Sequence, residues 1–176
     1  MATVIIRPDA GEASTGFDVD LTTQGGIDKI SYNSDSTSIT QNLSSAQFQV
    51  TMENSADYSG ATINSVQAFV RGVPGRSGAA DVTIKILNSD SDVLQSDGLE
   101  FSEGTQTLNG TAKESGLTPT IVDGLVLFVD PDSAGITIYD CWIVVDFTEA
   151  ATPFISKISG LVIGSVNKVS SLAKTS

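Results

Sequence analysis

Closely spaced aspartates are the residues of this sequence whose type and spacing could bind a metal. Asp90 and Asp92 flank Ser91, and Asp130 and Asp132 flank Pro131. Carboxylates at this spacing occur in calcium loops, but neither pair fits the twelve-residue EF-hand pattern with its central glycine and closing glutamate. Aspartate also stabilises turns by hydrogen bonding to nearby backbone. We expect this second role for both pairs, and the sequence predicts no metal and no cofactor.

Catalytic groups are scarce. The 176 residues include no histidine, which excludes a Ser-His-Asp triad, a Cys-His dyad and an imidazole proton shuttle. The 21 acidic residues could supply a glycosidase-like carboxylate pair, but nothing in the sequence places two of them in one cleft. Cys141, the single cysteine, lies in an apolar run and is expected to be a buried, inert thiol, as fits a reducing cytoplasm. We expect a protein that is not an enzyme.

Four aromatic residues could line a sugar-binding face. Tyr139 and Trp142 lie in the apolar segment 136–147, and Phe69 and Phe128 lie in two earlier apolar segments. Aromatic side chains in such segments most often pack in a core. Core packing is therefore the expected role, with sugar binding as the alternative.

The elements that must position these residues read as strands. Apolar residues alternate with polar ones at 48, 50 and 52, at 66, 68 and 70, and at 82, 84 and 86, which is the period of a strand with one buried face. Clusters of Ser, Gly, Asp and Asn separate the segments. No convincing helical spacing occurs between residues 36 and 149. The pattern predicts an all-β protein, an antiparallel β-sandwich or jelly roll with an N-terminal extension and a C-terminal arm.

Composition divides the chain into three parts. Residues 1–36 are predicted to hold one short strand and an extended segment that runs over the surface or reaches a neighbour. Residues 37–149 are predicted to form the sandwich, and residues 150–176 the arm. The arm carries three lysines and no acid, so the formal charge of −12 divides into +3 for the arm and −15 for the rest.

The arm contains two copies of one pattern, offset by eleven residues. A helix would align its apolar side chains in one stripe, but Ser, Gly, Val and Asn form helices poorly. An extended segment could instead add a strand to another sheet, and a mobile tail is a further alternative. We favour an arm that orders against a second subunit. The predicted assembly residues are Ile155, Lys157, Ile158, Leu161, Val166, Lys168, Val169 and Leu172.

Two classes of partner are not expected. A body at −15 would be repelled by phosphates, and the three lysines of the arm are spread out without interleaved aromatic residues, so we expect no nucleic acid. No apolar run approaches the length of a membrane span, and the N-terminal residues do not fit a signal peptide. The expectation is a soluble protein.

Several segments resemble the jelly-roll virion proteins of tailed bacteriophages. They are residues 2–10, 26–30, 46–52, 63–71 and 138–147, and the likeness spans about residues 1–148. The lysine-bearing unit of the arm is similar to short repeats that end other phage structural proteins. The resemblance implies a decoration or cement protein on the capsid surface of a virion, made in the host cytoplasm. It also implies a homo-oligomer, often a trimer, that binds the major capsid protein or another virion protein. The alternative function is a carbohydrate-binding, lectin-like module of a tail or fibre.

Overall fold

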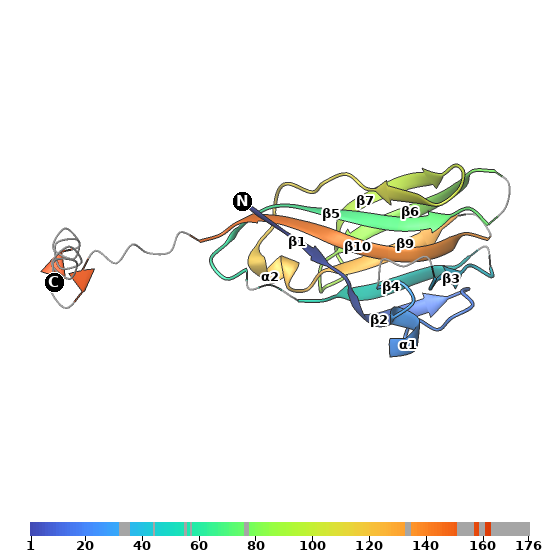
Figure 1. Ribbon diagram of the computed structural model, residues 1–176, viewed down its shortest axis with the longest axis horizontal. Coiled ribbons are helices and arrows are strands. Elements are labelled where there is room, and N and C mark those ends of the chain that lie inside the picture. Colours follow the sequence, from blue (N-terminus) through green and yellow to red (C-terminus); the bar gives the residue numbers. More distant parts are fainter. Residues whose placement is uncertain are drawn as a thin grey trace, which may run out of the picture.

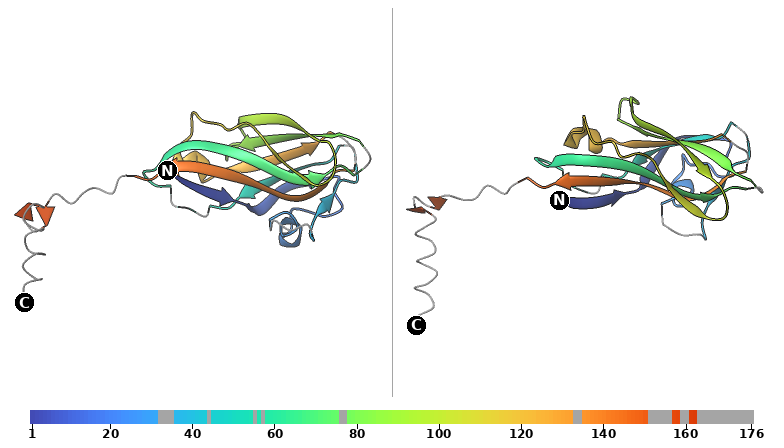
Figure 2. Two further views of the ribbon diagram at one scale, coloured as in Figure 1. Left: turned by 45° about the horizontal axis from the view of Figure 1, so that its top comes forward. Right: turned by 90° about the horizontal axis from the view of Figure 1, so that it is seen from above.

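The computed structural model describes residues 1–31, 36–43, 45–54, 56, 58–75, 78–132 and 135–150, together with 157–158 and 161–162. Two antiparallel sheets pack face to face, and the body is longest along its strands (Figure 1). The two layers are seen from above in the right-hand view of Figure 2. The predicted antiparallel β-sandwich is confirmed.

The first sheet, sheet A, is built around the two longest strands of the described chain. Its order is β1 (Ala2–Ile6), β10 (Thr137–Thr148), β5 (Thr62–Val73) and β8 (Gln106–Asn109). The short strand β3 (Ile39–Thr40) pairs with the beginning of β10, along the edge that β1 occupies farther on. β10 bulges between Ile138 and Asp140, where Tyr139 is the additional residue.

The second sheet, sheet B, has the order β2 (Pro8–Thr15), β4 (Gln47–Met52), β9 (Val126–Pro131), β6 (Ala80–Leu87) and β7 (Val93–Phe101). Two one-turn helices lie in the connections, α1 (Gln24–Ile27) and α2 (Pro119–Val122). Each begins at a threonine, Thr23 or Thr118, whose side-chain oxygen accepts a hydrogen bond from a backbone N–H of the first turn.

The core between the sheets consists of the residues that the alternating pattern predicts. Every apolar residue at positions 48, 50, 52, 66, 68, 70, 82, 84 and 86 is buried. The residues between them on the same strands point away from the core, because successive side chains of a strand face opposite sides of the sheet. Each sheet therefore has one open face, and the functional question concerns those two faces.

The N-terminal segment differs from the expected extension over the surface. β1 belongs to sheet A and β2 to sheet B, so residues 1–36 contribute a strand to each layer. Leu21, Ile27 and Ile30 of the same segment are fully buried in the core. Because these three large apolar residues stand isolated among polar ones, they produce no strand or helix period that could be recognised. The sandwich thus begins at Ala2 rather than at residue 37.

The described part of the arm is limited to two short strands. β11 (Lys157–Ile158) and β12 (Leu161–Val162) pair with each other in antiparallel register, with Lys157 opposite Val162 and Ile158 opposite Leu161. The backbone of these four residues is extended, but the two strands pair with each other and form a separate two-stranded sheet, whereas the strand alternative predicted addition to another sheet. The other five predicted assembly residues, Ile155, Val166, Lys168, Val169 and Leu172, lie outside the described residues.

Candidate functional site

Two aromatic side chains stack on the open face of sheet A. Trp142 of β10 and Phe69 of β5 are register partners, and both are half-buried. Their ring centroids lie 5.3 Å apart and the ring planes differ by 2°. Parallel rings in contact are separated by only about 3.5–4.0 Å. The pair is therefore offset, and part of each ring face is left uncovered by the other ring.

A buried ion pair holds Arg7 beside this aromatic pair. One guanidinium nitrogen of Arg7, Nη1, donates to both carboxylate oxygens of Asp140, at 2.9 and 2.8 Å. The Asp140 side chain has no solvent exposure, while that of Arg7 is 27% exposed. The guanidinium carbon of Arg7 lies 5.8 Å from the Trp142 ring centroid, within cation–π range. Trp142 thus stands between Phe69 and Arg7, and both neighbours restrict its motion.

Polar side chains surround the aromatic pair. Asn109 of β8 is exposed and lies opposite Phe69, and Thr107, also exposed, lies opposite Arg71. Gln67, two residues before Phe69, donates from Nε2 to the Gly110 carbonyl oxygen at 2.7 Å, which leaves its amide oxygen able to accept. Hydrogen-bonding groups of both kinds therefore border the rings. We call Trp142, Phe69, Arg7, Gln67 and Asn109 the aromatic platform.

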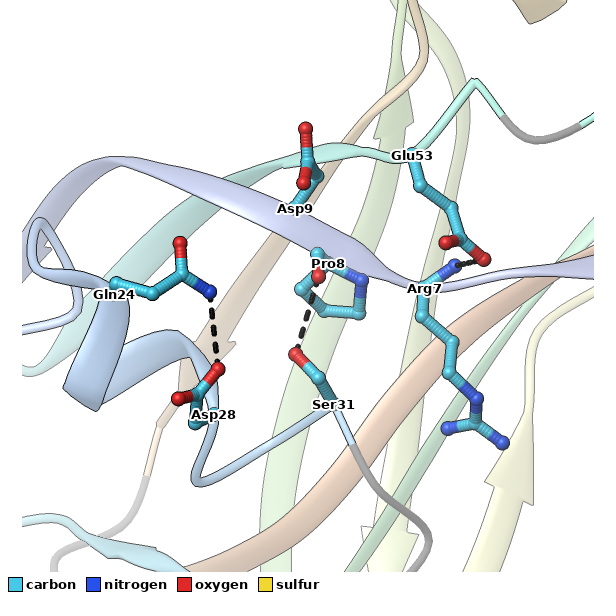
Figure 3. Close-up of a pocket in the computed structure, with 7 residues that line it drawn as sticks. All are labelled: Arg7, Pro8, Asp9, Gln24, Asp28, Ser31 and Glu53. Atoms are coloured by element: carbon cyan, nitrogen blue, oxygen red, sulfur yellow. Dashed lines mark hydrogen bonds between the residues drawn. The ribbon is translucent and has the colours of Figure 1, made fainter.

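A small polar pocket lies on the other side of the Arg7 backbone (Figure 3). Its volume is about 160 Å³. The lining comes from the β1–β2 junction, from α1 and the turn after it, and from the end of β4. The lining residues are Arg7, Pro8, Asp9, Gln24, Asp28, Ser31 and Glu53.

Two of the three pocket carboxylates already accept hydrogen bonds from the protein. Glu53 Oε1 accepts from the Arg7 backbone N–H at 3.1 Å, and Asp28 accepts from Gln24 Nε2 at 3.0 Å. The Ser31 hydroxyl lies within hydrogen-bond distance of the Pro8 and Ile27 carbonyl oxygens. These contacts fix the turn after α1 against β1 and β2. Across the described residues, no group of three or more His, Cys, Asp or Glu side chains is arranged to hold a metal ion.

The open face of sheet B also carries an aromatic residue, but a different environment surrounds it. Phe128 of β9 is half-buried, and the Lys85 ammonium lies 4.7 Å from its ring centroid. On the neighbouring strands, Glu12 accepts hydrogen bonds from Gln49 at 2.6 Å and from Thr51 at 2.9 Å. Lys85 therefore covers the single ring of this face, and the adjacent polar groups bond to one another.

The structure corrects the expected role of the four aromatic residues. Tyr139, Trp142, Phe69 and Phe128 are all half-buried, and none belongs to the core cluster. The reason is the strand period. Val70, Cys141 and Val129 next to them point inward, so the aromatic residues point to the open faces.

The first aspartate pair and the cysteine behave as expected. The Asn88 side-chain oxygen accepts from the backbone N–H of Asp90 at 3.0 Å and of Asp92 at 2.8 Å, which confirms turn chemistry for this pair. In the second pair, Asp132 bonds to β6: its backbone N–H donates to the Asp81 carbonyl oxygen, and its carboxylate accepts from the Thr83 hydroxyl at 3.4 Å. Cys141 is fully buried, and burial raises the pKa of its thiol well above the ordinary value, with the Asp140 charge adding to the effect. The thiol is therefore neutral and shielded from reagents.

Sequence reasoning missed the pair formed by Arg7 and Asp140, which are 133 positions apart. A signal for it exists, because Asp140 interrupts an apolar strand and a buried carboxylate requires a partner. The identity of the partner was not readable, since Arg7 reaches Asp140 only when β1 pairs with β10.

No protein-family model and no curated protein matches the chain. Among solved structures, the C-terminal CBM6 of LamC, a laminarinase from Zobellia galactanivorans, is 10% identical with a TM-score of 0.46, covering 82% of this chain and 98% of that chain. The CBM22-1 xylan-binding domain of Paenibacillus barcinonensis Xyn10C is 13% identical with a TM-score of 0.45, covering 84% and 95%. The enzymatically active domain of bacteriophage CBA120 tailspike protein 4 is 14% identical with a TM-score of 0.41, covering 82% and 19%. Likeness at this level carries no argument, and the site has to be judged from its own geometry.

No helix in the described part of the chain is both long enough and apolar enough to cross a membrane.

Proposed function

We propose that the body is a non-catalytic saccharide-binding module and that the aromatic platform on sheet A is its binding site. The observation that carries the proposal is the offset, half-buried pair Trp142 and Phe69 on the open face. The C–H faces of a sugar ring pack on aromatic rings, and a few polar groups placed around such rings fix the orientation of a ligand. Gln67 and Asn109 provide an amide oxygen and an exposed amide at the border of the rings.

The ion pair between Arg7 and Asp140 supports the same proposal. A binding site loses less conformational entropy on binding when its side chains are already fixed. Trp142 lies between Phe69 and the Arg7 guanidinium, which donates hydrogen bonds to both oxygens of the fully buried Asp140 carboxylate. Binding of a saccharide to these rings would therefore cost little side-chain conformational entropy.

The chemistry of the platform favours binding over turnover. Its residues are aromatic rings, amides and a guanidinium engaged in an ion pair, and none of these is a general acid or base near neutral pH. The expected ligands are neutral polysaccharides or oligosaccharides that can lie along an open sheet face.

Trp142 is the only tryptophan of the chain, which makes the test direct. The full chain is run through gels containing soluble glucans, xylans, mannans and galactans, and Trp142 fluorescence is titrated with the matching oligosaccharides. We expect retarded migration in at least one gel and a saturable emission change. Trp142→Ala should abolish the retardation, whereas Phe128→Ala on the opposite face should leave it intact. Unretarded migration of the wild-type chain in every gel, with unchanged emission, would contradict the proposal.

The decoration role implied by the phage resemblance stays a prediction, as do the virion location, the trimer and the capsid partner. The aromatic platform, which can be described atom by atom, favours the saccharide-binding proposal. Binding of the full chain to undecorated capsids would test the decoration role directly.

A further inference from the structure

An exposed apolar strip continues from the aromatic platform to the free edge of sheet A. Ile5 of β1 is 51% exposed and is the register partner of Val144, which is half-buried on β10. β1 is the end strand of the sheet order, and β10 is its partner there. Figure 2 shows β1 and β10 side by side, with β1 at the margin of the body. The strip made by Ile5 and Val144 therefore borders an open strand edge.

An unpartnered carboxylate oxygen lies two residues beyond this strip. Asp146 is half-buried on the same face of β10, opposite Thr3 of β1 and Ser65 of β5. Its Oδ1 atom is buried and has no hydrogen-bond partner among the described residues. A buried acceptor without a donor is unfavourable, more so when it carries charge. The position requires a donor, and a cation is the best one.

The sequence of the arm contains lysines next to aliphatic residues, and the arm begins shortly after Asp146. β10 ends at Thr148, two residues after Asp146, and the arm follows. In the sequence of the arm, Lys157 stands next to Ile158 and Lys168 next to Val169, in a segment of charge +3 attached to a body of charge −15. Lys157 follows Glu149 by eight residues, and eight extended residues span up to about 28 Å. That length is enough for the arm to turn back over the end of β10.

We propose that residues 155–172 dock on the body of their own molecule, across the outer surface of β1 and β10. Lys157 pairs with the Asp146 carboxylate, and the neighbouring aliphatic side chains cover Ile5 and Val144. The proposal is argued from Ile5, Val144 and Asp146, none of which belongs to the aromatic platform.

The molecule's own arm is favoured over that of a second copy for two reasons. A short tether gives an effective concentration in the millimolar range, above that of free protein in ordinary solution. Two bodies at −15 also repel each other, which opposes close approach of a second copy. Docking within one molecule differs from the intersubunit contact expected from sequence, and one experiment separates the two.

The test is carbodiimide cross-linking, which joins a carboxylate to an amine only when they touch. A mixture of ordinary and ¹⁵N-labelled full chain is cross-linked, digested and analysed by mass spectrometry. We expect a peptide that joins Asp146 to Lys157 with both halves of one isotope. Asp146→Asn should abolish this peptide, whereas Glu100→Gln, which removes a more exposed acid on sheet B, should leave it unchanged. Hydrogen exchange of the β1 amides should become several-fold faster in Lys157→Ser.

Three outcomes would overturn the proposal. The first is a peptide that joins light and heavy halves, which would assign the surface to the arm of a second copy. The second is equal cross-linking of Lys157 to acids on both sheets, which indicates no preferred surface. The third is the absence of the Asp146 peptide together with unchanged β1 exchange in Lys157→Ser.

Discussion

The two open faces of the sandwich carry similar residue types and differ in what covers their aromatic rings. On sheet A, Trp142 and Phe69 stack with an offset, and Arg7, which lies at the Trp142 ring, is held by a buried carboxylate. On sheet B, Phe128 stands alone and the Lys85 ammonium lies at its ring. Among the described residues, Lys85 forms no salt bridge. The two faces therefore differ in whether a side chain of the protein already covers the aromatic surface that a ligand could contact.

This comparison shows why composition alone does not locate a binding face. Both faces have an aromatic residue, a cation and neighbouring amides. On sheet B, Glu12 accepts hydrogen bonds from Gln49 and Thr51. On sheet A, the ion pair with Asp140 instead holds Arg7 at the Trp142 ring. A rigid aromatic surface is therefore a property of one face only, and the following changes should make or remove that difference.

The largest expected effect comes from Arg7→Met. The change removes the Arg7 guanidinium from a fully buried carboxylate, and removing one partner of a buried pair costs about 3–5 kcal/mol in the free energy of unfolding. Urea denaturation followed by circular dichroism measures it. Lys85→Met, which removes the cation of the other face, is the matched control and should cost less than about 1 kcal/mol. Equal losses for the two variants would remove the distinction between the faces.

The next effect concerns ligand binding. Trp142→Ala removes the central ring of the platform, and we expect a loss of saccharide affinity of about tenfold or more, which corresponds to about 1.4 kcal/mol. Phe128→Ala should change affinity less than twofold. Isothermal titration with the best oligosaccharide from the gel panel provides both numbers, and thermal melts check that each variant folds. A stronger effect of Phe128→Ala would move the site to sheet B.

The third effect is a pH dependence of stability that arises from Cys141. This thiol is buried in the core between the two sheets, so the effect should not distinguish the open faces. The folded-state pKa of the Cys141 thiol is raised by burial, so the unfolded chain ionises first, near its ordinary pKa of about 8.5. The contribution is fully present below that pH and is lost as pH rises toward the folded-state value. Stability should fall by about 1 kcal/mol between pH 8 and 9.5 beyond the loss seen in Cys141→Ala. Parallel curves for the two proteins would place the thiol in a more polar site than the structure does.

The smallest effect should come from uncovering Phe128. Lys85→Ser removes the ammonium from the ring, at a cost of about 0.5–1 kcal/mol for an exposed cation–π contact. The freed ring should bind saccharides no better than before, because it lacks a second ring beside it. Retardation in the polysaccharide gels measures this, and a Lys85→Ser protein that gains a second binding site would show that cover alone separates the faces.

Sequence patterns identified the core strands because the period of two is strong where one face is buried, as at Phe48, Val50 and Met52. The same period could have placed Trp142 and Phe69 on the outer face. The prediction for them was wrong because they were assigned to the core from the apolar segments that contain them, without the alternation of inward and outward positions along the strand. The N-terminal segment failed for another reason, since Leu21, Ile27 and Ile30 reach the core individually from a polar stretch.

The site itself was only partly predictable. Trp142 and Phe69 were recognised as candidates for sugar binding, and Arg7 was not. A contact between positions 7 and 140 depends on the pairing of the first and last strands of the body, and nothing local in the sequence encodes that pairing.

The pairing of β1 with β10 also determines how the body would respond to force. Ala2 lies opposite Phe147, so both ends of the sandwich leave from the same corner. A force applied to the two ends would break the backbone hydrogen bonds between these strands one after another, and not all at once. β1 would separate from β10 from Ala2 to Ile6 at low force. The first strong resistance would come at Arg7, where the ion pair with buried Asp140 lies and the chain crosses into sheet B.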